Sequence, residues 1–177
     1  GLGPRLVPGD AESRARMRLL IQTHDVYLAS ASGAQPQFWH TMGCMFLPTP
    51  RSGHPRAMDR ASRALRVREV HNQLVALDSL LDPEGPFAAG PALTLADITL
   101  YPTFVYLTFY LPRVFGWPDV FAGKPRLRAW HEMMSNHRLG RLARSQMSPA
   151  LDRKEQSGDL TELVEEASDP AYKWVYP

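Results

Sequence analysis

The ionisable side chain with the clearest chemical interest is His24, which lies among apolar residues instead of in a polar loop. Apolar and aromatic side chains recur around it at three- and four-residue steps, the spacing of one helix face. The residues on that face are Met17, Leu20, Ile21, Tyr27 and Leu28. Histidine is the side chain that titrates near neutral pH. The simpler interpretation is a core histidine bonded to a backbone carbonyl, because buried polar groups usually have such partners.

A second candidate is Cys44, the single cysteine of the chain. One cysteine excludes an internal disulfide, a cysteine-rich zinc site and a CxxC redox pair. No lysine, arginine or helix start near it would stabilise a thiolate, so we interpret Cys44 as an inert buried thiol. The six histidines show no HExxH or HxxEH spacing, and we assign no metal. No GxSxG, Walker or GxGxxG motif is present, and we assign no catalytic residue.

A helix start is encoded in residues 94–98, which read TLADI and open a long apolar run. Thr94 can accept a hydrogen bond from the Asp97 amide, while the Asp97 carboxylate accepts one from the Thr94 amide. This reciprocal capping accounts for an acid at position 97, and a catalytic role for Asp97 is not needed.

The elements that position these residues are predicted to be helical throughout, which makes the fold class all-α. A first helix should start at the Asp10 cap and run to about residue 32, and a second should span about 55–81. A third starts at Thr94 and continues through Pro102, and a fourth spans 125–136. The expected core positions of the second and fourth helices are Val70, Leu74, Leu77, Leu81, Leu127, Trp130 and Met134.

Composition and charge limit the function classes. The 177 residues, 44% hydrophobic and 21% charged, suit one ordinary globular domain. The net charge of +2 does not demand nucleic acid or anionic lipid as a partner. The charge-free run 98–112 is shorter than the roughly 20 apolar residues of a membrane-spanning helix. The chain begins at Gly1 without a secretory signal, so we expect a soluble intracellular protein of unknown compartment.

Charge is unevenly distributed along the chain. Six arginines cluster between residues 51 and 68, and no aromatic residues are interleaved with them as nucleic-acid binding would favour. We therefore expect a solvated or partner-facing helix surface there, with nucleic acid an improbable partner. Residues 152–169 carry seven acids against two basic residues, and this acidic segment can fold back onto the arginines.

The order of these segments resembles the C-terminal helical domain of the glutathione S-transferase family. That domain typically has a Pro- and Gly-containing loop, the motif [ST]-L-A-D-[IL], a proline and a Trp-bearing helix. Here the matching residues are Gly90, Pro91, 94–98, Pro102, Pro125 and Trp130. The resemblance covers about residues 5–145. It predicts a linker-like segment at 1–9, a helical domain at 10–146 and an acidic, aromatic extension at 147–177, with the family's thioredoxin-like half absent.

The resemblance also implies where a substrate would bind. In this family the first and the capped helix form the wall of a hydrophobic electrophile site. His24, Tyr27 and Tyr101 would line that wall if a thioredoxin-like half were present. No cofactor is expected on this chain alone, and glutathione is expected only together with such a half.

Three functions remain open at this point. The first is the substrate-wall half of a transferase that conjugates glutathione to a hydrophobic electrophile. The second, which we favour, is a non-catalytic docking subunit of a larger protein assembly, as other members of this fold family are. Its docking residues would be Tyr172, Trp174 and Tyr176, because aromatic side chains anchor interfaces. The third is contact with a membrane complex through the run 98–112.

Overall fold

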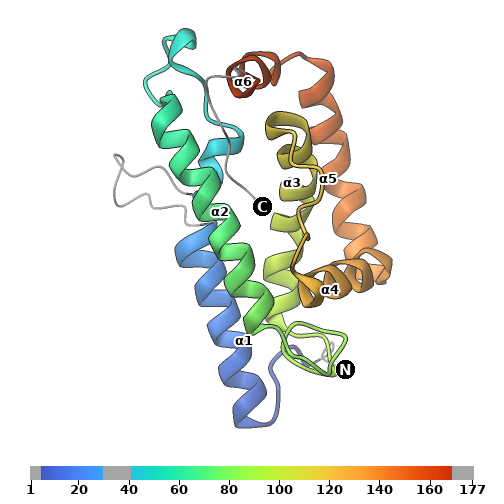
Figure 1. Ribbon diagram of the computed structural model, residues 1–177. Helices are drawn as coiled ribbons and strands as arrows, with labels where there is room; N and C mark the ends of the chain where they lie inside the picture. The colour runs from blue at the N-terminus through green and yellow to red at the C-terminus, as the bar shows by residue number, and fades with distance from the viewer. Residues whose placement is uncertain (1–4, 30–40, 169–177) are drawn as a thin grey trace.

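The computed structural model describes residues 5–29 and 41–168, and every regular element within them is helical (Figure 1). The helices are α1 (Ala11–Thr23), α2 (Arg60–Leu80), α3 (Leu95–Phe115), α4 (Pro125–Asn136), α5 (Arg138–Gln156) and α6 (Thr161–Ala167). Short helical turns are η1 (His24–Leu28), η2 (Thr41–Met45) and η3 (Pro50–Ser52). The described ranges contain no strand, only an isolated bridge between Phe87 and Gly90. The predicted all-α fold class is confirmed.

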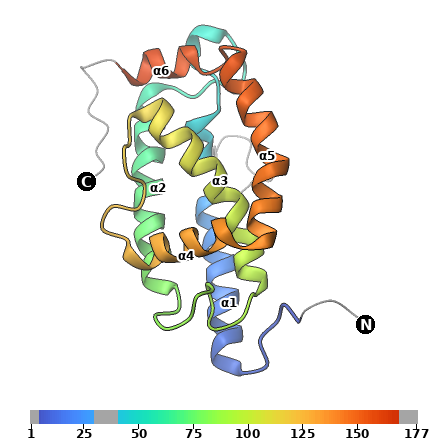
Figure 2. The same ribbon diagram turned by 90° about the vertical axis from the view of Figure 1, so that its right-hand side faces the viewer.

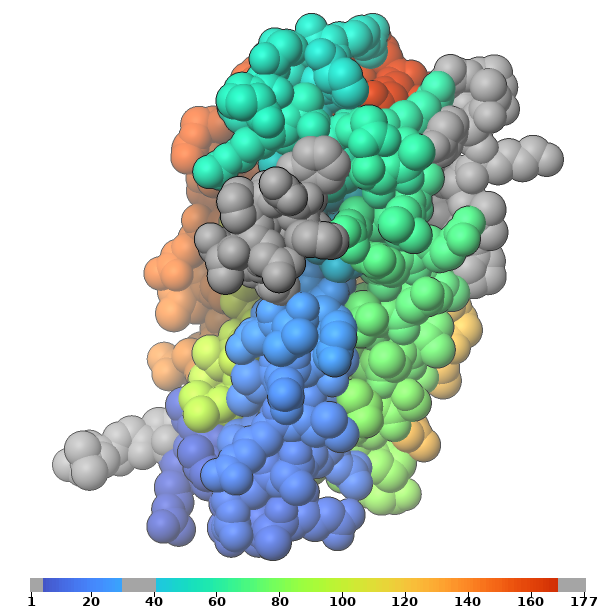
Figure 3. Space-filling model, turned by 90° about the vertical axis from the view of Figure 1, so that its left-hand side faces the viewer, coloured from blue at the N-terminus to red at the C-terminus, as the bar shows by residue number. Residues whose placement is uncertain are grey.

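The helices form a bundle around α3. Helices α1, α2, α3 and α5 run lengthwise, α4 crosses one end, and α6 lies at the other end (Figures 1 and 2). Helix α3 contacts α1, α4, α5 and α6, and most of its residues are buried. Figure 3 shows α1 and α2 side by side on one face of the bundle. The core therefore sits along α3.

Helix α1 begins where the sequence indicates. The Asp10 carboxylate accepts a hydrogen bond from the Ser13 amide at 2.7 Å. Beyond Thr23 the chain continues as the π-helical turn η1, and residues 30–40 lie outside the described residues. A π-turn takes one more residue than an α-turn. Leu28 therefore occupies the buried position, and Tyr27, expected on the apolar face, is 57% exposed.

Helix α2 starts five residues later than predicted. The cap is Asp59, whose carboxylate accepts from the Ser62 amide at 3.0 Å and from the Ser62 hydroxyl at 2.6 Å. This local capping fixes the helix start at Arg60 and leaves Pro55 outside the helix. The predicted core positions of α2, Val70 to Leu81, are all buried as expected.

Helices α3 and α4 follow the prediction closely. Helix α3 starts after the Thr94 cap and continues through Pro102 and Pro112 to Phe115. Helix α4 spans Pro125–Asn136 and buries Leu127, Trp130 and Met134. Across 5–29 and 41–168, none of the helices combines the length and the apolar character needed to cross a membrane.

Candidate functional site

His24, the first residue of η1 and the residue directly after α1, is linked to α3 through its side chain. Its Nδ1 lies 2.7 Å from Asp25 Oδ1, and its Nε2 lies 2.7 Å from Thr103 Oγ1. The prediction of a buried histidine is confirmed, but its partners are a carboxylate and a hydroxyl instead of a backbone carbonyl. The order acid, histidine, hydroxyl is that of nucleophile triads. Thr103 is buried in the middle of α3, however, so the bonds serve to join the two helices.

The three residues predicted to form a substrate wall point in different directions. Tyr27 is largely exposed, and its carbonyl accepts from the Thr41 hydroxyl at 2.7 Å. Tyr101 is buried and faces α4, where its hydroxyl bonds Ser135 Oγ at 3.2 Å and its ring meets Trp130 edge to face. His24 instead faces Thr103. The structure does not bring these three side chains together, and their role as a wall stays a prediction.

Asp97 organises one end of the bundle. Its Oδ2 accepts from the Thr94 amide at 2.8 Å and from the Thr94 hydroxyl at 3.0 Å, within the predicted capping box. Its Oδ1 accepts from the Ala88 amide at 2.7 Å and from Trp130 Nε1 at 2.9 Å. The carboxylate is 0% exposed, and four donors satisfy it. We call Asp97 with Ala88, Thr94 and Trp130 the Asp97 cluster; it supports the structural interpretation of Asp97.

Arg63 corrects the expectation of a solvated basic surface, because it is 0% exposed. Its Nε donates to Glu166 Oε1 of α6 at 2.8 Å. Its terminal nitrogens donate to four carbonyls at 2.7–3.2 Å, those of Cys44, Leu47, Pro48 and Met58. A guanidinium has five N–H donors in a rigid fork. Arg63 faces inward because segment 44–58 supplies enough acceptors; we call Arg63, Glu166 and these carbonyls the Arg63 cluster.

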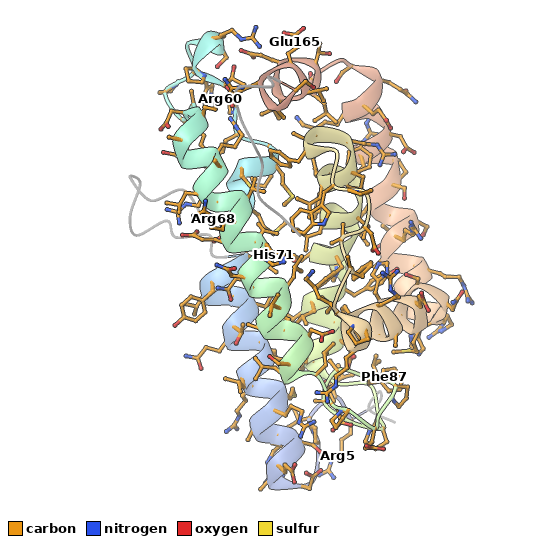
Figure 4. The ribbon with its side chains drawn as sticks, in the orientation of Figure 1. Arg5, Arg60, Arg68, His71, Phe87 and Glu165 are labelled. Carbon is orange, nitrogen blue, oxygen red and sulfur yellow. The ribbon has the colours of Figure 1, made fainter. Side chains whose placement is uncertain are left out.

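The neighbouring arginines pair with the same acidic helix at the surface. Arg51 lies 3.1 Å from Glu165 Oε2, and Arg60 donates to the Glu166 carbonyl at 2.8 Å. Figure 4 shows Arg60 and Glu165 at one end of the bundle and Phe87 at the other. The expectation that the acidic segment folds back onto the arginines is confirmed for α6.

Two groups that the sequence left unassigned have shifted pKa values. Burial lowers the pKa of His131 to about 4, because its ring lies among Tyr101, Phe104 and Phe121. Burial also lowers the pKa of Lys124, although Asp119 and Asp78 oppose this shift. No spacing in the sequence marks Lys124 as buried or His131 as partly buried.

Cys44 is a buried free thiol, and burial raises its pKa to about 12. A thiol with that pKa is protonated at neutral pH and is a poor nucleophile. The interpretation of Cys44 as an inert buried thiol is therefore supported. Among the described side chains, no three His, Cys, Asp or Glu residues are placed to hold a metal ion.

Within residues 5–29 and 41–168, α3 carries an apolar stripe that is exposed. Leu95, Ile98 and Tyr106 are 38–40% exposed, and Pro102 between them is partly exposed. Their spacing of three, four and four residues places them on one helix face; we call these four residues the α3 stripe. The segment before α1 contacts the first residue of the α3 stripe, because the Leu95 amide donates to the Leu6 carbonyl at 3.0 Å.

These elements agree with a comparison against protein families. Residues 60–132, which span α2, α3 and most of α4, match the family model of the glutathione S-transferase C-terminal domain. Residues 60–132 are therefore similar to the glutathione S-transferase C-terminal domain. Comparisons with curated proteins and with solved structures gave no match. The recognised resemblance is confirmed, and the match carries no information on catalysis, glutathione or partners.

Two sets of predicted residues need separate statements. Tyr172, Trp174 and Tyr176 lie outside the described residues. Helix α5 continues across the predicted boundary at 146/147, and Leu151, Leu160, Leu163 and Ala167 belong to the hydrophobic core. The part of the extension up to residue 168 is therefore packed against the helical domain. Two sequence signals pointed to partners of these residues: the Asp that directly follows His24, and the acidic segment that contains Glu166, the partner of Arg63.

Proposed function

We propose that this domain is a non-catalytic docking subunit that packs its α3 stripe against another folded protein. The exposed stripe is the observation that carries the proposal. Apolar side chains aligned on one face are typical of contact sites, and interface cores are depleted of charge. No Asp, Glu, Lys, Arg or His belongs to the stripe, and the Leu6 carbonyl places the N-terminal segment beside its first residue.

The chemistry of the buried polar groups supports a role without catalysis. The Asp97 carboxylate and the Arg63 guanidinium both form their hydrogen bonds with other residues of the domain. Cys44 is protonated, and His24 is occupied by Asp25 and Thr103. A transferase must hold and activate a thiolate. The side chains of Asp97, Arg63 and His24 are instead bonded to other residues of the domain.

The test compares a stripe variant with a matched surface variant. Ile98→Asp places a charge in the middle of the stripe, while Val75→Asp makes the same change at a 48% exposed position of α2. Each tagged full-length chain is isolated from its source and measured by native mass spectrometry with peptide identification. The expected result is a heteromeric particle with wild type and Val75→Asp that is lost with Ile98→Asp. A particle retained by Ile98→Asp would contradict the proposal.

The aromatic residues Tyr172, Trp174 and Tyr176 are a second part of the same proposal. Deletion of the whole segment 152–177 would remove core residues of α6 and would confound the test. Ending the chain at Ser168 avoids this problem, because it removes only the residues beyond α6. We expect this shorter chain to fold normally and to lose partner affinity. Full retention of the particle would leave the α3 stripe as the docking site and exclude the aromatic residues.

The alternative function is the substrate-wall half of a glutathione transferase, which the exposed side chains of Val26 and Tyr27 in η1 favour. Under this alternative the particle contains a thioredoxin-like polypeptide and conjugates glutathione to a hydrophobic electrophile. Glutathione is then bound by that partner. A particle without such a half and without conjugating activity would exclude this alternative.

A further inference from the structure

A groove beside Trp130 of the Asp97 cluster shares no residue with the proposed docking face. It has a volume of about 410 Å³ and lies between residues 81–87 and α4. Its walls are mostly apolar: Pro83, Pro86, Phe87, Ala129, Trp130 and Met133. Ligand pockets in proteins are typically about 300–1,000 Å³, apolar, with few polar groups. We call this space the α4 groove.

The loop wall of the α4 groove is fixed by its own backbone contacts. Asp82 Oδ1 accepts from the Glu84 amide at 2.9 Å and from the Gly85 amide at 2.7 Å. A Cβ at Gly85 would lie 2.3 Å from the Gly90 carbonyl, so glycine permits the two backbone segments to touch. Phe87 is held by the bridge to Gly90. This wall exists before any ligand arrives, which lowers the entropic cost of binding.

The helix wall is equally fixed. Trp130 contributes to the groove while its Nε1 donates to Asp97 at 2.9 Å, so the indole cannot rotate without breaking the Asp97 cluster. Met133 lies one turn further along α4, and its flexible thioether adapts to different apolar shapes. A flat or extended apolar body can therefore lie between Phe87 and Trp130.

The charged residues at the groove favour a ligand with a negative charge. Asp82 is neutralised by Arg16, whose Nη1 lies 2.7 Å from Asp82 Oδ2. Arg126 also lines the groove, is exposed, and makes no ion pair or hydrogen bond within the described residues. One guanidinium is left without a counter-ion. Guanidinium binds carboxylates through two parallel N–H···O bonds.

We propose that the α4 groove binds a small organic carboxylate with an aromatic or aliphatic body, with its carboxylate paired to Arg126 and its body against Trp130 and Phe87. Volume, apolar walls and the single uncompensated positive charge carry this assignment. It is independent of the α3 stripe and holds whether or not the domain docks to a partner.

The first test measures binding by isothermal titration calorimetry with 2-naphthoate and decanoate, and with uncharged 2-naphthalenemethanol. Wild type should bind both carboxylates saturably and more tightly than the alcohol. Arg126→Gln should weaken carboxylate binding about 3- to 10-fold, the range for one ordinary hydrogen-bonded contact at an exposed position, and leave the alcohol unaffected. The matched control is Arg68→Gln, an exposed arginine on α2 far from Phe87 (Figure 4), which should change neither.

A second variant tests the cavity itself. Ala129 is exposed on α4, so Ala129→Phe fills the groove without disturbing the core. This variant should abolish binding of all three compounds while its circular dichroism spectrum and melting temperature match wild type. The proposal is overturned if neither carboxylate binds saturably, if Ala129→Phe binds as well as wild type, or if Arg126→Gln and Arg68→Gln have equal effects.

Discussion

The Asp97 cluster and the Arg63 cluster are two fully buried charges at opposite ends of one bundle, and they are built differently. Asp97 takes two bonds from Thr94 and one from Ala88, both within nine residues of it, and only Trp130 is distant. Arg63 takes its acceptors from 44–58 and its counter-charge from Glu166, 103 residues away. One cluster depends on a short motif and the other on the assembled fold.

Because the Asp97 bonds are mostly local and the Arg63 bonds are long-range, the two ends of the bundle depend on different segments for their stability. Breaking a buried ion pair by removal of one partner is strongly destabilising, because the other charge stays buried without compensation. The Arg63 end therefore depends on α6 being in place, while most of the Asp97 end is held by its own loop. The following predictions test this comparison from the largest to the smallest expected effect.

Removal of α6 should have the largest effect. A chain ending at Gln156 loses the buried side chains of Leu160 and Leu163, about 1.5–3 kcal/mol each, and leaves Arg63 without Glu166. We expect the free energy of unfolding in urea to fall by at least about 5 kcal/mol, which approaches the whole stability of many domains. The control is a chain ending at Ser168. Equal stability of the two shortened chains would show that α6 does not support the Arg63 end.

Arg63→Ala should cost about 3–5 kcal/mol, because it leaves the largely enclosed Glu166 carboxylate and four carbonyls without their donor. The measurement is urea unfolding followed by circular dichroism. Arg68→Ala at an exposed position of α2 should cost less than about 0.5 kcal/mol. Similar losses for the two arginines would mean that Arg63 is not the centre of its cluster.

Asp97→Asn should cost less, about 2–3 kcal/mol. The amide keeps one acceptor for Ala88 and Trp130 but directs N–H donors at the Thr94 amide, which loses its charge-assisted bond. The matched control is Asp152→Asn, the same change at an exposed position of α5. If Asp97→Asn proved more damaging than Arg63→Ala, the ranking of the two ends would be reversed.

Acid should weaken the Asp97 end through His131. Its folded pKa of about 4 lies below the ordinary histidine pKa of 6.5, so the unfolded chain takes up a proton first as the pH falls. Stability is therefore retained above pH 6.5 and lost on the way to pH 4. After allowance for partial solvent screening we expect a loss of about 1–2 kcal/mol between pH 7 and 5. His131→Phe, which keeps the ring contacts, should remove this part of the pH dependence; an unchanged profile would contradict it.

The surface pair beside the Arg63 cluster should matter least. Arg51 and Glu165 are 61% and 58% exposed at their side chains, and such pairs contribute roughly 0–1 kcal/mol. Arg51→Gln should change the unfolding free energy by less than about 0.5 kcal/mol, with the change disappearing in 1 M salt. A loss above 1 kcal/mol would place Arg51 within the buried cluster instead of at its edge.

The sequence predicted the parts of the fold that depend on neighbours in the chain. The TLADI motif identified the Asp97 capping box, Pro125 marked the start of α4, and periodicity identified the buried face of α2. It did not predict that Arg63 is buried, because the acceptors come from irregular segments whose path no periodic pattern records. It also placed Tyr27 on the core face, since nothing in residues 24–28 signals a π-turn. The α4 groove was missed because its two walls lie about 40 residues apart.

The contact between Arg63 and Glu166 has a consequence for biosynthesis. The ribosome adds about 5–20 residues per second and releases the earlier part of a chain first. Arg63 therefore cannot pair with Glu166 until another 103 residues have been synthesised. During those roughly 5–20 seconds the α2 arginines cannot be enclosed with their native partner, and segment 44–58 lacks its final anchor. The domain thus completes its core only when α6 has left the exit tunnel, and the apolar side chains that pack against α6 stay exposed until then.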